Sequence, residues 1–115
     1  MSFRFQVLYE YCNPARLLHG AAQAVFFDVC MAYLPLPLRK PGFWEELGFT
    51  RNLNVNFLRT AKLGEFVIID LEVTQIGKNM CYLQGSMKRE RDGALISTCE
   101  QNKFNTGGGN MMAKL

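Results

Sequence analysis

The 115-residue chain carries 13 Lys and Arg against 10 Asp and Glu, for a formal net charge of +3. This length corresponds to one domain, and the 49% hydrophobic content is high for a small monomer, which favours an oligomer. The mild charge and the lack of a basic stripe interleaved with aromatic residues argue against a nucleic-acid partner.

The cysteines indicate whether a zinc site or disulfide bonds are to be expected. Cys12, Cys30, Cys81 and Cys99 form no CxxC pair, and His19 is the only histidine in the sequence. A structural zinc site is therefore not expected. Because no signal peptide precedes the domain, we expect reduced thiols in an intracellular compartment.

The first predicted elements are a strand and a central helix. Residues 1–10 alternate apolar and polar side chains, which predicts a strand with one buried face. After a loop at 11–18, the segment 19–34 is apolar apart from His19, Gln23 and Asp28. It predicts a helix buried on every side. The helix is too short to span a bilayer and contains a carboxylate, so no membrane span is expected.

The spacing within this helix constrains any site built on it. Gly20 and Asp28 are eight residues apart, which is about 12 Å along a helix axis. His19 and Asp28 fall on roughly opposite faces. One copy of the helix therefore cannot direct both its N-terminal amides and its carboxylate at one reacting atom. Two antiparallel copies could, so the spacing predicts composite sites between two chains.

The second half of the chain predicts four strands. Prolines end the helix, and Phe43 and Trp44 in the following loop are expected to pack. Alternation, β-branched content and tight-turn signals predict strands at 50–59, 66–76, 80–90 and 94–104. One strand, a helix and a four-stranded antiparallel meander give an α+β domain over 1–105, in which a curved sheet covers the helix. The Gly-rich segment 106–115 is expected to be a flexible tail.

Three motifs carry a resemblance to a known family. Segment 13–28 reads NPARLLHGAAQAVFFD, segment 54–64 reads NVNFLRTAKLG, and segment 75–79 reads QIGKN. In this order and at these intervals they resemble the hotdog-fold acyl-CoA thioesterases of the PaaI-like type. The resemblance covers most of residues 3–105. It implies the hotdog fold, a curved antiparallel sheet of about five strands around one central helix.

The resemblance also implies hydrolysis of an acyl-CoA thioester, with CoA as part of the substrate and no separate cofactor. Asp28 is the candidate base or nucleophile, and the choice stays open; its structural alternative is to cap a loop. The amide of Gly20, at a helix N-terminus, is the candidate oxyanion donor; its structural alternative is loop-to-helix packing. His19 would hold this amide in place. Asn13 would hold the carbonyl or the attacking water, or make an Asx turn. Thr50 would orient water or the carboxylate, or be ordinary strand composition.

Binding of the CoA moiety is expected at basic residues and turn amides near strand ends, with Gly77-Lys78-Asn79 the best candidate. The candidates are Arg59, Lys62, Gly77, Lys78, Asn79 and, less specifically, Lys103. Any single Lys among them could equally belong to a solvated turn. Thr60 stands where the family usually has Pro, so the loop around it is expected to be looser.

Partners and location follow from the same reasoning. We expect an acyl-CoA substrate and a homodimer or dimer of dimers. The C-terminal Ala113-Lys114-Leu115 resembles a peroxisomal address, which predicts a peroxisomal protein, otherwise a cytoplasmic one.

Two other functions stay open. An enoyl-CoA hydratase or dehydratase of the same fold would use His19 as acid and base. A non-catalytic acyl-CoA-binding module is favoured by Ala21 in place of the family's second Gly, by Thr60, and by the lack of a leading helix. Acyl chain length does not follow from the sequence, and Phe43 and Trp44 could instead form a lid over an acyl tunnel.

Overall fold

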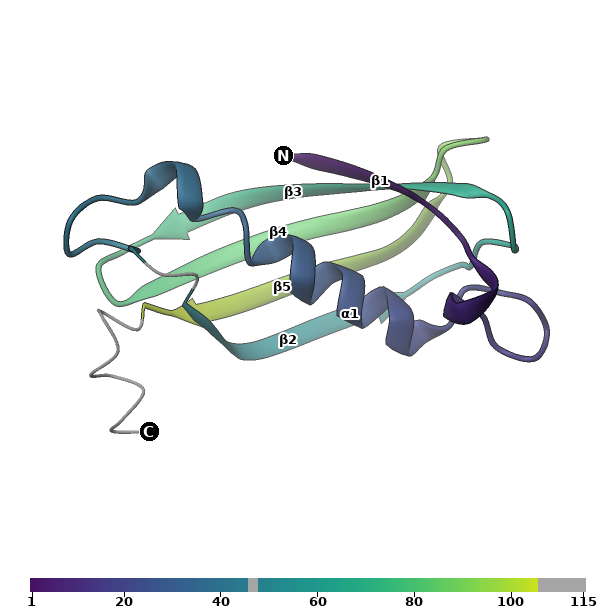
Figure 1. Ribbon diagram of the computed structural model, residues 1–115, viewed down its shortest axis with the longest axis horizontal. Helices are drawn as coiled ribbons and strands as arrows, with labels where there is room; N and C mark the ends of the chain where they lie inside the picture. The colour runs from purple at the N-terminus through teal and green to yellow at the C-terminus, as the bar shows by residue number, and fades with distance from the viewer. Residues whose placement is uncertain (46–47, 106–115) are drawn as a thin grey trace.

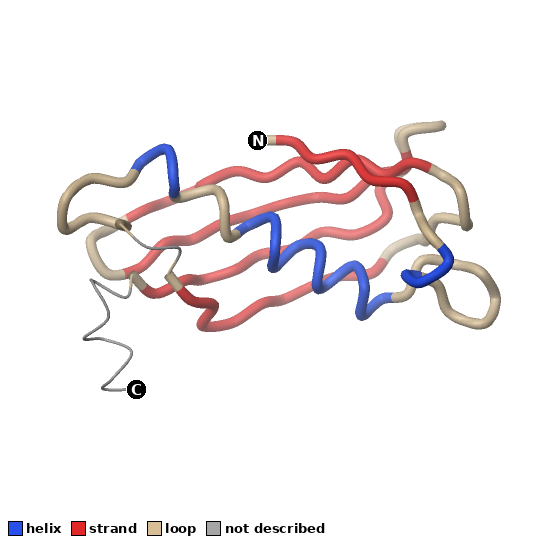
Figure 2. The backbone as a smooth tube through the Cα atoms, viewed as in Figure 1, coloured by secondary structure: helices blue, strands red, loops and turns tan. Residues whose placement is uncertain are grey.

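The computed structural model describes residues 1–45 and 48–105 and contains a curved five-stranded antiparallel sheet with α1 lying across one face (Figure 1). This arrangement confirms the predicted α+β hotdog fold. Two short 3₁₀ turns, η1 and η2, flank α1, and Figure 2 shows them as brief helical segments in the connecting loops. The elements are β1 (Ser2–Gln6), η1 (Tyr9–Tyr11), α1 (Gly20–Met31), η2 (Leu36–Leu38), β2 (Phe49–Phe57), β3 (Phe66–Ile76), β4 (Met80–Arg89) and β5 (Leu95–Phe104).

The strand order is β1-β3-β4-β5-β2, so the predicted meander of the last four strands is wrong for β2. Only β3, β4 and β5 follow one another through short turns. The segment 58–65 instead crosses the end of the sheet, where the N–H groups of Leu58 and Arg59 both donate to the carbonyl of Ile96. A tight hairpin would have paired β2 with β3. This longer crossing leaves β2 as an edge strand beside β5.

A bulge in β2 determines which side chains face the helix. Thr50 pairs with Lys103 of β5, but the register then shifts, so that Asn52 pairs with Asn102. The shift inserts Arg51 as an extra residue. Thr50 consequently faces α1, whereas Asn52 faces outward and accepts a hydrogen bond from the Asn102 side chain at 3.2 Å.

The core lies between α1 and the sheet. Phe27 and Met31 of α1 are fully buried, and burying side chains of this size stabilises the fold by about 1.5–3 kcal/mol each. Their neighbours in the core cluster come from several strands. These include Val67, Ile69, Leu83, Met87 and Ile96.

The opposite face of α1 carries an exposed apolar stripe. Val25 is 59% exposed and Val29 is 52% exposed, and Tyr33 continues the stripe beyond the helix. The prediction of a helix buried on every side is therefore wrong for the single chain. The reason is that five strands cover only one side of the helix (Figure 1). An apolar stripe of this kind is typical of a surface that another chain covers.

The segment Gly20–Leu38 is long and apolar enough, with a mean hydropathy of 1.4, to pass a composition test for a membrane-crossing helix. This is weak support for crossing, because core helices pass the same test. α1 itself has 12 residues and is about 18 Å long, short of the roughly 30 Å hydrocarbon core. Its Asp28 is hydrogen-bonded to the sheet.

The loop between α1 and β2 is anchored by Trp44. Its side chain is fully buried, and its indole N–H donates to the carbonyl of Gly77 at 2.7 Å. Gly48 has a φ of +71°, and a Cβ there would collide with the Phe104 carbonyl and the Trp44 ring. Trp44 is therefore a packing residue, as predicted. The predicted tail at 106–115 and the peroxisomal tripeptide lie outside the described residues and stay predictions.

Candidate functional site

Asp28 lies in the third turn of α1 and reaches down to the inner face of β2 and β5. The Thr50 hydroxyl donates to its Oδ1 at 2.6 Å, and the Gln101 side-chain amide donates to the same oxygen at 2.7 Å. The Gln101 amide also donates to the Thr50 hydroxyl at 3.0 Å, which closes a triangle of polar contacts. These bonds fix the carboxylate on the sheet, and the β2 bulge is what brings Thr50 to it.

The two oxygens of Asp28 are not equivalent. Both hydrogen bonds go to Oδ1, and within residues 1–45 and 48–105 Oδ2 accepts none. Gln101 is fully buried, and its Oε1 has no hydrogen-bond partner in the same part of the chain. An arrangement of this kind holds a carboxylate by one oxygen and leaves the other available for chemistry.

A pocket of about 570 Å³ opens beside Asp28. Its walls are mostly apolar, with Thr50 and Lys103 as polar members besides Asp28. The lining residues are Asp28, Val29, Ala32, Tyr33, Gly48, Phe49, Thr50 and Lys103. Lys103 lies near the end of β5, as expected, and its side chain is buried on the inner face of this strand. Burial lowers the pKa of Lys103, and the nearby charges of Asp28 and Cys81 act in the opposite direction.

Cys99 lies close enough to Asp28 for the carboxylate charge to change the pKa of its thiol. Burial, followed by the negative charges of Asp28 and Glu100, raises the pKa of the Cys99 thiol to about 12. The thiolate is the reactive form of cysteine. Cys99 therefore stays a protonated core residue at neutral pH and is not a candidate nucleophile.

The N-terminal end of α1 forms a second group of candidate residues. His19 is the N-cap, and its Nδ1 accepts a hydrogen bond from the Ala21 N–H at 2.9 Å. Asn13 Oδ1 accepts from the N–H groups of Ala15 and Leu17, at 2.9 and 3.2 Å, which is an Asx-type turn. Both side chains thus order the loop before the helix. The N–H of Gly20 has no acceptor among the described residues, so it is available to a ligand.

The single chain does not bring these two groups together. Asp28 lies two turns along α1 from Gly20, about 12 Å away. The ring of Phe57, in β2, packs against Gly20, where an added Cβ would lie 3.3 Å from it. Thr50 and Gln101 join Asp28, whereas Asn13 and His19 stay at the other end of the helix. One chain therefore holds half of the predicted constellation at each end of α1.

The candidate CoA-binding residues are also divided between two ends. Arg59 and Lys62 precede β3, whereas the turn at 77–79 follows it. The 11 residues of β3 separate them by about 36 Å. The carbonyls of Gly77 and Lys78 accept hydrogen bonds from Trp44 and Asn105. The side chains of Lys78 and Asn79 are exposed.

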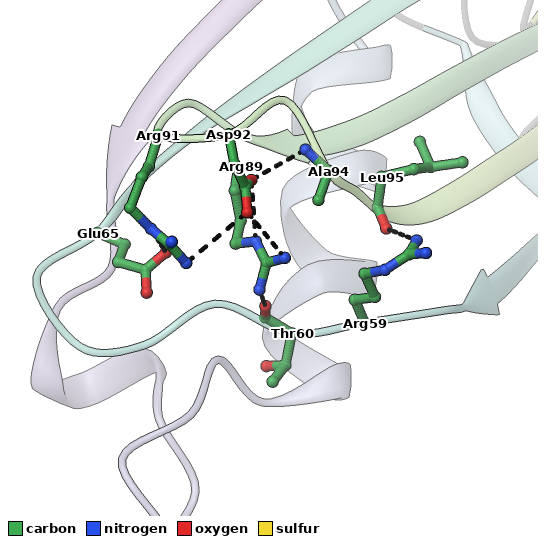
Figure 3. A network of polar contacts seen from close by, with 8 residues as sticks. All are labelled: Arg59, Thr60, Glu65, Arg89, Arg91, Asp92, Ala94 and Leu95. Carbon is green, nitrogen blue, oxygen red and sulfur yellow. Dashed lines mark hydrogen bonds and ion pairs between the residues drawn. The ribbon is translucent and has the colours of Figure 1, made fainter.

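Figure 3 shows the polar network around Arg59 and Thr60. One nitrogen of Arg59 donates to the carbonyl of Leu95 at 2.9 Å. Arg89 donates to the carbonyl of Thr60 and makes an ion pair with Asp92. The Thr60 hydroxyl also donates to the Leu18 carbonyl at 3.2 Å. The loop that was expected to be loose is therefore tied to its neighbours at Thr60.

Two residues of the Asp28 site were not predicted as such. Gln101 was not singled out at all, and Lys103 was assigned to phosphate binding. The segment 95–104 carries polar residues on both parities, so its sequence does not show which parity faces the helix. Among residues 1–45 and 48–105 there is also no group of three metal-ligating side chains.

Comparisons with known proteins agree with this geometry. A family model described as the thioesterase superfamily matches residues 16–96. A zebrafish thioesterase superfamily member 2 structure is 20% identical, with a TM-score of 0.80, and the match covers 90% of this chain and 72% of that one. No curated protein matches the sequence.

Two bacterial structures are similar. A hypothetical thioesterase with coenzyme A from Streptococcus pneumoniae is 20% identical, with a TM-score of 0.81 and coverage of 92% and 80%. The PaaI protein of the phenylacetic acid degradation operon of E. coli is 14% identical, with a TM-score of 0.76 and coverage of 90% and 73%. At these identities the structures show the fold, and the family model shows the family. The chain belongs to the thioesterase superfamily, and its predicted class, a thioester hydrolase, is confirmed.

Proposed function

We propose that this protein hydrolyses acyl-CoA thioesters at sites shared between two chains. Asp28 of one chain would face the Gly20 amide of its partner, with Asn13 and His19 holding the loop around that amide. The observation that carries the proposal is the state of Asp28: Oδ1 is held by Thr50 and Gln101, and Oδ2 is unbonded within the described chain. The coenzyme A in the similar streptococcal thioesterase supports the substrate class.

The geometry supports a simple reaction. Oδ2 of Asp28 takes a proton from a water molecule as the water oxygen attacks the thioester carbonyl carbon. The carbonyl oxygen becomes an oxyanion, which the Gly20 N–H of the partner stabilises. The C–S bond then breaks, the acid product forms, and the CoA sulfur takes the proton from Asp28. Direct attack by Oδ2 would give an anhydride that water hydrolyses, with the same products.

The exposed stripe of α1 supports a second copy as the partner. Val25, Val29 and Tyr33 are each about half exposed, and β2 is an edge strand whose end carries exposed Phe57 and Leu58. An uncovered edge strand and an apolar helix stripe on one side of a small domain favour a symmetric dimer. Antiparallel packing of two α1 helices would place each Asp28 near the other chain's Gly20. A dimer of dimers is compatible with the same contact.

The proposal is tested with a panel of acyl-CoA substrates, from acetyl to long-chain and aryl, and a thiol reagent that detects released CoA. Asp28→Ala should lower kcat by at least about 100-fold, because it removes the general base or nucleophile. Size-exclusion chromatography should show the same oligomer for the variant. Unchanged turnover in Asp28→Ala, or no hydrolysis of any substrate by the native protein, would end the proposal.

The hydratase alternative depends on His19. Because Nδ1 of His19 accepts the Ala21 N–H, we assign His19 to holding the helix N-terminus. Measuring the loss of enoyl absorbance beside thiol release distinguishes the two reactions. A purely acyl-CoA-binding protein would instead show CoA-dependent thermal stabilisation without turnover.

A further inference from the structure

Lys103 is a buried residue in the wall of the pocket, and none of the residues 1–45 and 48–105 forms an ion pair with it. Its side chain is 3% exposed, and it lies on the inner face of β5, opposite Thr50. It lines the same pocket as Asp28. In the part of the chain that the structure describes, Lys103 takes part in no ion pair and its ammonium makes no hydrogen bond to a side chain or carbonyl.

An ammonium that borders a largely apolar pocket without a paired anion is poorly compensated. Asp28 is near enough to influence Lys103 electrostatically, but no carboxylate oxygen lies within 4 Å of the ammonium in the described residues. Among the described residues that line the pocket, Val29, Ala32 and Phe49 are apolar and offer no compensating charge. A ligand with a negative group would complete this pocket. Its burial separates Lys103 from the exposed cations, such as Lys62, that suit the phosphates of CoA.

We propose that Lys103 binds a carboxylate at the far end of the acyl group, so that the preferred substrates are short dicarboxylic acyl-CoA monothioesters. This inference rests on the proposed function, in which the thioester carbonyl lies at Asp28. Gln101 holds Asp28, and Lys103 is the next residue along β5 on the same face, about 6.6 Å further on. A short acyl chain that begins at Asp28 therefore ends beside Lys103. The charge of Asp28 repels a terminal carboxylate toward the ammonium.

The test compares succinyl-CoA with butyryl-CoA, which have the same number of acyl carbons and differ in the terminal group. The native enzyme should show a kcat/KM for succinyl-CoA about 10- to 100-fold above that for butyryl-CoA, as expected for a hydrogen bond to a charged group. Lys103→Met should lower this ratio by the same factor, and Lys103→Arg, which keeps the charge, should recover part of it. Lys88→Met is the matched control, because Lys88 pairs with Asp70 on the outer face; it should leave the ratio unchanged.

Other outcomes would overturn the inference. They are a native preference for butyryl-CoA, or an equal ratio in Lys103→Met and the native enzyme. If neither thioester is hydrolysed, calorimetry of the same two ligands tests the inference: Lys103→Met should then weaken binding of succinyl-CoA by the same factor and binding of butyryl-CoA much less. The proposed function itself fails only if no member of the acyl-CoA panel is hydrolysed. If Lys103→Met does not fold, Lys103→Gln replaces it in both measurements.

Discussion

The two ends of α1 differ in how completely one chain builds them. At the Asp28 end, β2 and β5 supply Thr50 and Gln101, and the carboxylate is fixed on the sheet. At the Gly20 end, the candidate side chains come from the loop before α1, and β2 contributes only packing by the Phe57 ring. His19 and Asn13 bond to that loop and not to a neighbouring strand, and the Gly20 N–H has no acceptor among the described residues.

This difference shows where a second chain is needed. The sheet curves under the helix (Figure 1), and among the described residues the hydrogen bonds from its side chains to a side chain of α1 are those to Asp28. The outer stripe of α1, at Val25 and Val29, runs between the two ends and is exposed. Packing this stripe against a second copy would bring the fixed Asp28 carboxylate of one chain close to the Gly20 N–H of the other. Association and catalysis would then depend on the same surface.

The largest expected effect comes from removing the Gly20 amide. Gly20 is the first residue of α1, where Pro is tolerated because its missing N–H has no helical acceptor. His19 precedes it with φ −66° and ψ 139°, a conformation that Pro at the next position allows. Gly20→Pro should therefore keep the fold but lower kcat by about 10²–10³, the usual loss for one oxyanion donor.

Gly20→Ala is the matched control for this variant. It keeps the N–H and adds a Cβ at the same place, 3.3 Å from the Phe57 ring in the present packing. Steady-state kinetics and thermal melts of both variants separate the amide from the added bulk. Equal kcat values for Gly20→Pro and Gly20→Ala would remove the amide from the mechanism.

Mixing two inactive variants tests whether the ends of α1 work across chains. Asp28→Ala and Gly20→Pro each disable a different end. In a mixed dimer one site receives both mutations and the other receives none. After subunit exchange at equal concentrations, about a quarter of the native rate should return, because half of the dimers are mixed and each has one intact site. A rate that stays at the sum of the two separate variants contradicts a shared site.

Much of the Asp28 end could be predicted because it depends on local sequence. The apolar run around Asp28 predicts the helix, and the family resemblance assigns Thr50 to the carboxylate. The position of β2 could not be predicted in this way. Strand order depends on how the segment 58–65 crosses the sheet, and its hydrogen bonds to Ile96 are contacts between residues far apart in the chain. The bulge at Arg51 likewise has no signal in the sequence.

Gln101 and Lys103 show a further limit of the sequence. A half-buried strand is recognised by apolar residues on one parity, but β5 places polar residues on its buried face at Ser97, Gln101 and Lys103. This breaks the pattern at the site itself. Polar residues on a buried face are costly to stability, and functional sites are where such departures from the local rules are expected.

Thr50 should have a smaller effect than either end of the helix. Thr50→Val removes the hydroxyl that donates to Oδ1 and leaves Gln101 as the remaining donor. We expect kcat to fall about tenfold, the lower range for a hydrogen bond to a charged group, with KM little changed. Thr50→Ser keeps the hydroxyl and should recover most of the rate. Equal losses in both variants, measured with one acyl-CoA, would reduce Thr50 to a packing residue.

The smallest effect concerns the free energy of unfolding at alkaline pH, which depends on buried cysteines such as Cys99 near Asp28. Burial raises the pKa of Cys99 to about 12 and that of Cys81 to about 11, from an ordinary value of 9.0. Unfolded thiols lose their protons above pH 9 while the folded ones keep them. The contribution of these thiols to the free energy of unfolding should therefore be constant below pH 9 and fall above it, by up to about 1.4 kcal/mol per pH unit for each thiol.

Lys103 acts in the opposite direction, because its pKa is lowered in the folded state and its contribution rises with pH. Burial also raises the pKa of Cys30, so three thiols against one amine leave a net loss of stability as the pH rises. Urea titrations between pH 8 and 11, with reductant present, measure this slope. Cys99→Ala should cost stability at pH 8 through the small cavity it leaves, but show a flatter decline above pH 9. If its slope equals the native one, Cys99 is ionised in the folded protein, and the Asp28 end is more open to solvent than its packing requires.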